Sequence, residues 1–228
     1  MINTTMEKKI MISFIAAMDR EALPLAEKMK KKQIIKENKK TFYRGEIFGK
    51  EAVIAVSGIG KVNAALTAQI IINKYSPDYM INFGAVGGLD GSISALSYYC
   101  VHESCQYDFD LSDVDDVERG YIQDYDKVFF PSEIKGAEFL QKVRLATADK
   151  FTHKTRDVKT VLKMGCKICD MEGAAISQVC FSSSLPLYII KGVSDVYGSG
   201  IQYEQFRNNL NCVVKGFPDI IEKIIKNK

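Results

Sequence analysis

The chain has 228 residues, of which 46% are hydrophobic and 26% are charged; this argues against a disordered, collagen-like or membrane-spanning protein. Its 31 Lys and Arg residues against 28 Asp and Glu residues leave a net charge of +3. Basic residues gather only at 30–32 and 39–40, so the charge balance does not call for a nucleic-acid partner. We expect a single domain over residues 1–228, in which residues 1–9 are a polar N-terminal extension.

The start of the chain and its cysteines favour a cytoplasmic protein that does not enter a membrane. The first apolar run, 10–17, is too short and wrongly flanked for a signal peptide or a membrane span. Six cysteines in a chain of this length, without a signal peptide, are predicted to be reduced thiols. Cys166 and Cys169 form a lone CxxC pair, and neither His102 nor His153 stands at zinc-finger spacing, so we predict no metal site.

The first third of the sequence alternates apolar runs with helical patterns. The run 10–17 predicts a buried strand, and the apolar spacing over 23–29 predicts a helix after it. The lysine-rich region 30–40 has few aromatic residues, and we interpret it as a solvated helix face rather than a nucleic-acid site. A second strand over 51–56 ends in a Gly-rich turn and leads into a helix up to Lys74.

The middle of the sequence contains shorter strands and one long acidic loop. A strand over 79–83 precedes the densest glycine cluster of the chain, at 84–88. Further strands are predicted at 97–101 and 144–147. The acidic, turn-rich stretch 108–119 between them is predicted to be a loop or lid, because loops of this length in a compact domain are usually functional or disordered.

The last third repeats the alternation of helix and strand. We predict a helix over 171–180, a buried strand over 187–193, and an amphipathic helix over 203–226 that is interrupted near Pro218. Strands that alternate with helices throughout a chain favour a mostly parallel sheet.

Candidate functional residues follow from this arrangement, because ligands of open α/β sheets bind beyond the carboxyl ends of the strands. Glu21, Glu172 and Asp195 stand there, and several carboxylates together suit acid–base chemistry and the binding of hydroxyl groups. Alternatively, Glu172 and Asp195 are helix N-terminal residues stabilised by the helix dipole. Phosphate binding has weak support, since neither a Walker loop nor GxGxxG is present. The polar residues that follow apolar runs are Glu21, Ser57, the glycines at 84–88, Asp149, Ser194 and Asp195.

Five spaced blocks carry a resemblance to a known family. They are MDRE at 18–21, SGIGKVNAA at 57–65, INFGAVGGL at 81–89, DMEGAA at 170–175 and VSDV at 193–196. In this order they resemble the 5'-methylthioadenosine/S-adenosylhomocysteine nucleosidases of the nucleoside phosphorylase superfamily. The resemblance extends from Ile12 to the C-terminal helix. It implies a single-domain, three-layer α/β/α fold around a central mixed, largely parallel, twisted sheet.

The resemblance also assigns roles to the acidic residues. Asp195, which follows Ser194, matches the acid that donates a proton or hydrogen bond to purine N7; such an acid is needed because an adenine anion is a poor leaving group at neutral pH. Glu21 matches the carboxylate that orients and deprotonates the attacking water. Glu172 matches the residue that holds the ribose hydroxyls, and Met171 the methionine that packs against the ribose.

The remaining predicted site residues concern the purine and the 5' end. Phe151 matches the aromatic ring that stacks on the purine, and the backbone of Thr152 stands where the family reads the adenine edge. Three residues match the pocket for the 5' substituent: Met18, Ile59 and Phe206. The resemblance also implies four further substrate-binding residues: Ala85, Gly87, Asp170 and Lys191.

The sequence departs from the family at three places. Ala85 stands where Ser is usual, and Lys191 stands where Arg is usual; Lys cannot replace the fork geometry of Arg. Gln106 and Tyr107 occupy positions where Tyr and His are expected, and 111–120 is acidic rather than aromatic. These departures leave open which 5' substituent is preferred.

The leading hypothesis is therefore a nucleosidase that releases adenine and a thioribose from 5'-thio-substituted adenine nucleosides, without a cofactor. The resemblance implies a homodimer whose interface completes each pocket. Phosphorolysis by a purine nucleoside phosphorylase is a second hypothesis, but a carboxylate such as Glu21 repels phosphate, and Ala85 offers no hydroxyl. The sequence is also compatible with a hydrolase for another nucleoside and with a nucleoside-binding homologue that lacks turnover.

Overall fold

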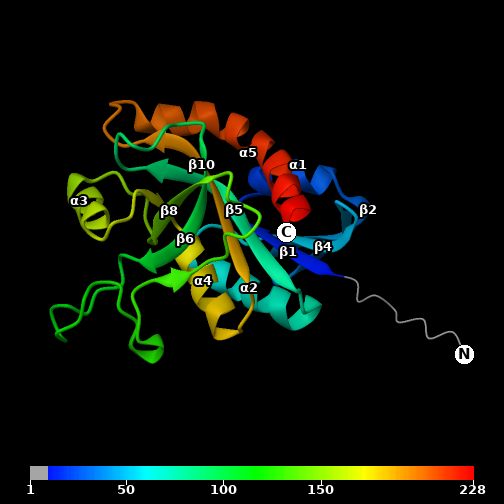
Figure 1. Ribbon diagram of the computed structural model, residues 1–228, viewed down its shortest axis with the longest axis horizontal. Helices are drawn as coiled ribbons and strands as arrows, with labels where there is room; N and C mark the ends of the chain where they lie inside the picture. Colours follow the sequence, from blue (N-terminus) through cyan, green and yellow to red (C-terminus); the bar gives the residue numbers. More distant parts are fainter. Residues whose placement is uncertain (1–9) are drawn as a thin grey trace, which may run out of the picture.

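A mixed ten-stranded sheet organises residues 10–228, the part of the chain that the computed structural model describes (Figure 1). The predicted extension 1–9 lies outside the described residues. The strands are β1 (Met11–Ala16), β2 (Lys30–Glu37), β3 (Lys40–Ile47), β4 (Lys50–Val56), β5 (Tyr79–Gly88), β6 (Tyr98–Gln106), β7 (Phe130–Pro131), β8 (Gln141–Thr147), β9 (Ile168–Asp170) and β10 (Leu187–Val196). The helices are α1 (Asp19–Glu27), α2 (Lys61–Tyr75), the 3-10 turn η1 (Gln123–Tyr125), α3 (Thr155–Lys163), α4 (Gly173–Ser182) and α5 (Gln202–Asn227).

Parallel strands form the centre of the sheet, with β4, β1, β5 and β10 side by side in that order. Antiparallel pairs lie further out, where β3 joins β4 and β2 joins β3. On the other side β10, β6, β8, β9 and β5 pair in turn, and β5 pairs again with β10, so these five strands close a ring. β8 and β9 run antiparallel to β5, but the register pairs Thr147 with Asp170, Cys169 with Gly87, and Gly87 with Asp195, so the carboxyl ends of β5, β8, β9 and β10 come close together.

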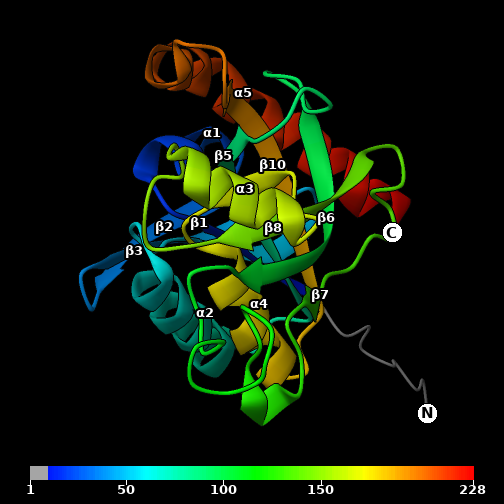
Figure 2. The same cartoon turned by 90° about the vertical axis from the view of Figure 1, so that its left-hand side faces the viewer.

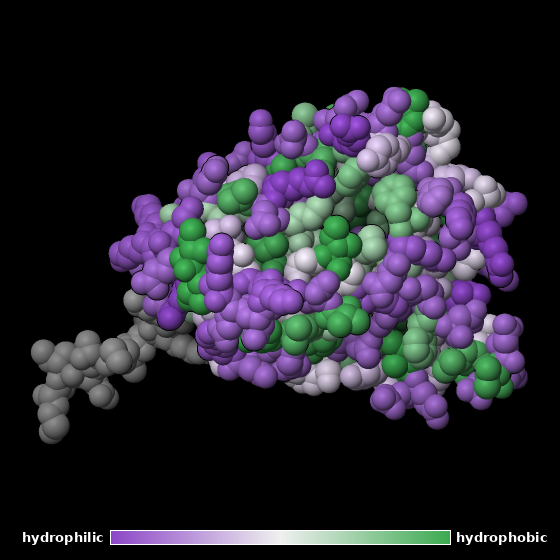
Figure 3. Space-filling view, turned by 180° about the vertical axis from the view of Figure 1, so that it is seen from behind, coloured by the Kyte–Doolittle hydropathy of each residue, from purple (hydrophilic) through white to green (hydrophobic). Residues whose placement is uncertain are grey.

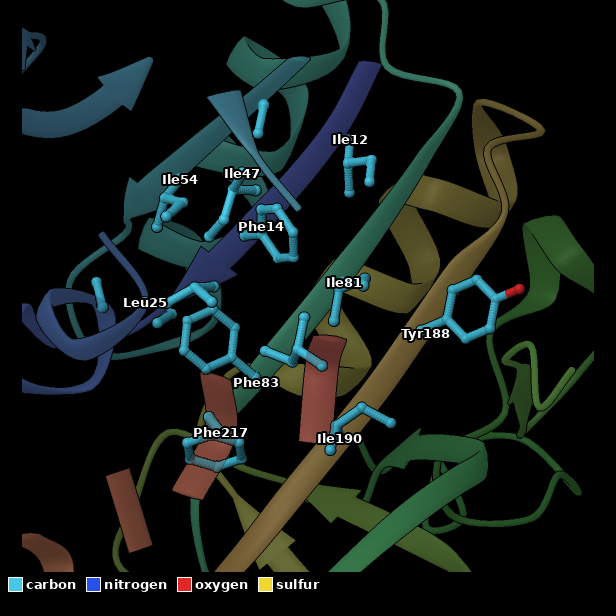
Figure 4. Close-up of a cluster of buried hydrophobic side chains, with 14 of the residues drawn as sticks. Ile12, Phe14, Leu25, Ile47, Ile54, Ile81, Phe83, Tyr188, Ile190 and Phe217 are labelled. Carbon is cyan, nitrogen blue, oxygen red and sulfur yellow. The ribbon is translucent and has the colours of Figure 1, made fainter. Parts of the chain in front are cut away.

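Helices cover both faces of the sheet, which makes the predicted three-layer α/β/α arrangement correct. In Figures 1 and 2, α1 and α5 lie together over one face, and α2 and α4 lie together over the other. β1 shows why the strands are buried on both sides: Ile12 and Phe14 enter the cluster under α1 and α5, whereas Ile15 enters the cluster under α2 and α4. Figure 4 shows the first cluster, where Phe83 meets Phe217 of α5 at 5.3 Å between ring centroids.

The prediction of a helix face at 30–40 is wrong, because this region forms the hairpin of β2 and β3. Asn38 and Lys39 have positive φ angles of 51° and 58°, as a tight two-residue hairpin turn requires. Most of the β2 side chains are exposed, but Lys40 is buried, and its ammonium donates hydrogen bonds to Ser57 O and to Asn63 Oδ1. A charged, exposed edge strand has no apolar alternation from which it could be recognised in the sequence.

Two further predictions need correction. The strand predicted over 79–83 does not end there, because β5 continues through the glycine cluster to Gly88. α5 is also not interrupted at Pro218, which lies inside the helix and is buried beside Phe217. Burial of this apolar stretch of α5 against the core offsets the hydrogen bond that proline cannot donate. Helix α3 and strand β9 were not predicted.

Within residues 10–228, no helix is long and apolar enough to cross a membrane. Hydrophilic side chains cover most of the face seen from behind, with smaller apolar groups between them (Figure 3). All six cysteines are free thiols, and Cys105 and Cys166 lie with their sulfur atoms 3.7 Å apart.

Candidate active site

A cavity of about 260 Å³ lies where the carboxyl ends of β1, β5, β9 and β10 meet the first turns of α1 and α5. This volume is close to the lower end for small-molecule sites. All the predicted site residues except Thr152 and Lys191 line it. The lining residues are Ala17, Met18, Arg20, Glu21, Ile59, Ala85, Val86, Gly87, Phe151, Cys169, Asp170, Met171, Glu172, Ser194, Asp195 and Phe206.

Glu21 projects from the first turn of α1 into the floor of the cavity, where its side chain is buried. One carboxylate oxygen accepts the backbone N–H of Ala85 at 2.9 Å, and the other accepts that of Met18 at 3.0 Å. A Cβ atom at Gly84 would lie 2.8 Å from Glu21 Oε1, so the glycine is needed for this close approach. Burial raises the pKa of Glu21, and the N–H donors and the charge of Lys191 partly oppose that rise.

Asp195 lies in β10, next to a register shift between Val193 and Asp195 in the pairing with β5. Such a bulge re-aims a side chain, here into the cavity. Its carboxylate accepts hydrogen bonds from the Ser194 hydroxyl and from Gln202 Nε2, each at 2.7 Å. Burial raises the pKa of Asp195, and these two hydrogen bonds lower it in part. The alternative that Asp195 begins a helix is wrong, since the residue is inside a strand.

Glu172 is the N-cap residue of α4, but its side chain makes no hydrogen bond to that helix. Instead its Oε1 atom accepts the backbone N–H of Gly60 at 2.8 Å, at the start of α2. Burial and the neighbouring charge of Asp170 raise the pKa of Glu172 to about 7, against the effect of the Gly60 N–H and Lys191. The glutamate thus joins two helix N-termini at the cavity wall.

A buried ion pair supports this wall from behind. Lys191 does not line the cavity, because its Nζ atom lies 2.9 Å from Asp170 Oδ2, with both side chains almost fully buried. Asp170 also accepts hydrogen bonds from the Thr147 hydroxyl at 2.6 Å and from the Gly173 N–H at 2.9 Å. These contacts hold the turn between β9 and α4, from which Met171 and Glu172 face the cavity.

Aromatic and apolar side chains form the mouth of the cavity. The rings of Phe151 and Phe206 lie 6.3 Å apart and inclined by 72°, and Phe151 is 44% exposed. Ile59, which also lines the cavity, is 53% exposed. Thr152 does not line the cavity: its side chain turns inward, and its hydroxyl lies 2.6 Å from the Tyr107 hydroxyl.

Ser57 and Asp149 were candidates because each follows an apolar run, but neither lines the cavity. Both make hydrogen bonds next to the start of α2. The Ser57 hydroxyl donates to backbone carbonyl groups, and Asp149 Oδ1 accepts the N–H of Lys61 at 2.7 Å. Asp108 at the start of the acidic loop accepts the N–H of Asp149 and pairs with the Lys61 ammonium at 2.7 Å. The predicted loop 108–119 is therefore tied to the start of α2, close to the cavity.

Comparison with known proteins agrees with this geometry. A sequence model of the phosphorylase superfamily matches residues 12–226. A 5'-methylthioadenosine/S-adenosylhomocysteine nucleosidase of Staphylococcus carnosus is 30% identical over 228 residues, covering 95% of this chain and all of the relative. The chain belongs to this nucleosidase family. The nucleosidase of Oceanobacillus iheyensis is 31% identical over 229 residues, covering 94% of this chain and 98% of its own.

Solved structures of nucleosidases share the fold. The enzyme of Colwellia psychrerythraea, in complex with adenine, superposes with a TM-score of 0.89 at 26% identity and covers 96% of each chain. The Neisseria meningitidis enzyme, in complex with methylthio-immucillin-A, gives a TM-score of 0.88 at 27% identity, with 96% of this chain and 99% of that chain covered.

Sequence reasoning missed four residues that line the cavity, Ala17, Arg20, Val86 and Cys169, and it also missed Gln202. Gln202 binds Asp195 from the first turn of α5. Arg20 lies inside a block that was recognised, so its position next to Glu21 could have revealed it. No sequence signal could have revealed Gln202, which reaches the site only through the packing of α5. Within the described chain, no group of three or more His, Cys, Asp or Glu side chains could hold a metal ion.

Proposed function

We propose that the chain hydrolyses the N-glycosidic bond of 5'-thio-substituted adenine nucleosides, methylthioadenosine and S-adenosylhomocysteine among them, releasing adenine and a thioribose. The convergence of three buried carboxylates, Glu21, Glu172 and Asp195, on one cavity of a nucleosidase fold carries this proposal. Curated relatives named for these two substrates support it.

The purine lies against Phe151 with its N7 atom at Asp195. Burial keeps Asp195 protonated to a higher pH than an exposed aspartate, so it can donate to N7 as the bond to the ribose breaks. A neutral adenine then leaves in place of an anion. Gln202 and Ser194 hold the carboxyl group in position, which limits the reorganisation required in the transition state.

The ribose lies between Met171 and the other two carboxylates. Glu172, once ionised, accepts hydrogen bonds from the ribose hydroxyls, and Glu21 orients a water molecule and takes its proton as the water attacks the anomeric carbon. The backbone N–H groups of Ala85 and Met18 hold Glu21 in place for this role.

Water is preferred over phosphate as the nucleophile because of the charges around the cavity. Four carboxylates line it, whereas the charge of Lys191 is paired with Asp170 behind the wall. Arg20 is the only Lys or Arg side chain among the lining residues, and it lies at the exposed mouth. A phosphate ion at the floor would face uncompensated carboxylates.

Release of adenine from methylthioadenosine, S-adenosylhomocysteine, adenosine and inosine, each with and without phosphate, tests the proposal. We expect phosphate-independent release from the two thio-nucleosides. Asp195→Asn should lose most of the turnover and still bind the nucleoside. A strict requirement for phosphate would instead establish phosphorolysis, and wild-type rates in Asp195→Asn would remove Asp195 as the acid.

We further propose that the chain acts in the cytoplasm as a single-domain subunit of a homodimer. Exposed apolar side chains support the second part: Val62 and Leu66 on α2 are 78% and 49% exposed, and Val114 on the acidic loop is 81% exposed. Sedimentation analysis of the wild type and of Val62→Glu tests it, since a dimer through α2 should be weakened by the introduced charge. A monomeric wild type would refute it.

A further inference from the structure

Arg20 occupies a distinctive place at the mouth of the cavity. It is exposed on the first turn of α1, next to the buried Glu21. Its Nε and Nη2 atoms donate to the sulfur of Met18 at 3.4 and 3.3 Å, and its guanidinium carbon lies 5.8 Å from the centre of the Phe206 ring. Met18 and Phe206 are two of the three residues predicted to line the pocket of the 5' substituent, so this prediction places the cation where the 5' arm of a nucleoside leaves the cavity.

The guanidinium is available for a stronger partner. A thioether sulfur is a weak acceptor, whereas guanidinium offers five N–H donors in a planar fork that fits a carboxylate. No described carboxylate lies within 4 Å of Arg20: the ion pairs of the described residues are formed by other side chains. The contact with Phe206 holds the group without consuming these donors.

Negative and positive side chains of the site lie at opposite ends of the cavity. The buried floor carries Glu21, Glu172 and Asp195, and the exposed mouth carries Arg20. A nucleoside whose 5' arm carries a carboxylate fits this distribution of charge. Its uncharged base and ribose meet the carboxylates of the floor, and its carboxylate meets the cation at the mouth.

We propose that Arg20 is a specificity-determining residue that favours adenine nucleosides whose 5' arm ends in a carboxylate over those with a neutral arm. S-adenosylhomocysteine has such a carboxylate, with an ammonium group on the carbon next to it, and methylthioadenosine has none. The inference rests on the proposed function, because the proposed function places the ribose at Met171 and the 5' carbon at Met18 and Phe206. Arg20 acts on the binding of the arm and not on the breaking of the glycosidic bond.

A matched pair of nucleosides tests the proposal: 5'-deoxy-5'-(3-carboxypropylthio)adenosine and its carboxamide, which have nearly the same size and differ by one charge. The measurement is kcat/KM for each in the wild type, Arg20→Gln and Arg20→Lys. We expect the wild type to prefer the carboxylate by about fivefold, the size expected of one partly exposed charge pair. Arg20→Gln should abolish the preference through KM, Arg20→Lys should retain part of it, and higher salt should reduce it in the wild type.

Two controls separate this role from a structural one. Arg207→Gln removes an exposed arginine next to Phe206 that does not line the cavity, and it should keep the preference. Turnover of methylthioadenosine measures any general effect of Arg20→Gln on the cavity, since this substrate has no carboxylate for the guanidinium, and the preference is the ratio between the two matched nucleosides within each variant. An unchanged preference in Arg20→Gln, or equal losses for all three nucleosides, would overturn the proposal.

The test remains decisive if the proposed function fails. Absence of adenine release from every nucleoside in the wild type would refute the hydrolase, whatever the role of Arg20. The dissociation constants of the carboxylate and the carboxamide, measured by calorimetry on the wild type and Arg20→Gln, would then decide the inference by the same ratio. Equal affinities of the wild type for the two nucleosides would refute it.

Discussion

Replacing Lys191 by Met removes the buried cation behind the cavity. Its ammonium lies 2.9 Å from Asp170 Oδ2, and the two side chains are only 3% and 2% exposed. Breaking such a pair from one side costs about 3–5 kcal/mol, because a buried charge is left without compensation. Asp170 keeps the Thr147 hydroxyl and the Gly173 N–H as donors, so we expect the lower end, about 3 kcal/mol of the free energy of unfolding. In a chain of this size that corresponds to a Tm lower by about 6–12 °C.

The same substitution should shift the pH dependence of activity. Lys191 lowers the pKa of Glu172, which burial and Asp170 raise to about 7. Without the cation this pKa rises further, so a smaller fraction of Glu172 is ionised at neutral pH. Because ionised Glu172 is the form that accepts the ribose hydroxyls, the acidic limb of the kcat/KM profile should move to higher pH. Lys191→Arg retains the charge and should leave the limb near its wild-type position.

Urea unfolding and adenine release from methylthioadenosine across a pH series are the measurements. Lys159→Met is the matched control, since Lys159 is exposed on α3 and its loss should change the free energy of unfolding by less than about 0.5 kcal/mol. A cost of Lys191→Met below about 1 kcal/mol, together with an unmoved acidic limb, would show that the ion pair does not balance the charges of this site.

Two further predictions concern the carboxylates of the cavity. Gly84→Ala places a methyl group 2.8 Å from Glu21 Oε1 and should lower kcat by about 10- to 100-fold; Gly91→Ala, with nothing within 4 Å, is the control, and equal rates in the two variants would contradict the reasoning. The free energy of unfolding should fall as pH rises from 4.5 through about 7, because folded Glu172 holds its proton over this window while the unfolded chain has lost it. Glu172→Gln should flatten that fall, as denaturant unfolding at pH 5 and pH 8 would show, and an unchanged difference would assign the dependence to other groups.

The central strands could be predicted from sequence because they are buried on both faces. The runs that became β1, β4 and β10 are mostly apolar along their length, which distinguishes them from loops and from amphipathic helices. β2 could not be recognised, since its exposed lysines carry no such pattern and only its pairing with β3 makes it a strand. The continuity of α5 through Pro218 likewise depends on tertiary packing, which no local rule for proline contains.

The site residues could be predicted where a carboxylate stands at the end of an apolar strand or just after it, as Glu21 and Asp195 do. The electrostatics of the site could not, because they depend on contacts between distant segments. Gln202 reaches Asp195 across the turn after β10, and Lys191 compensates Asp170 from a different strand.

The different protonation states that catalysis requires of Asp195 and Glu172 follow from those contacts. Asp195 is desolvated and meets only side-chain donors, Ser194 and Gln202, so its charged form is poorly stabilised and the acid form can serve the leaving purine. Glu172 accepts a backbone N–H from Gly60 and feels Lys191, which keep its ionised form accessible near neutral pH despite its burial. Catalysis by this pair requires a protonated Asp195 and an ionised Glu172 together, and that combination is favoured only if the Asp195 pKa exceeds that of Glu172 in the complex. Removal of the Gln202 hydrogen bond should therefore extend activity to higher pH, whereas removal of Lys191 should narrow it from the acidic side.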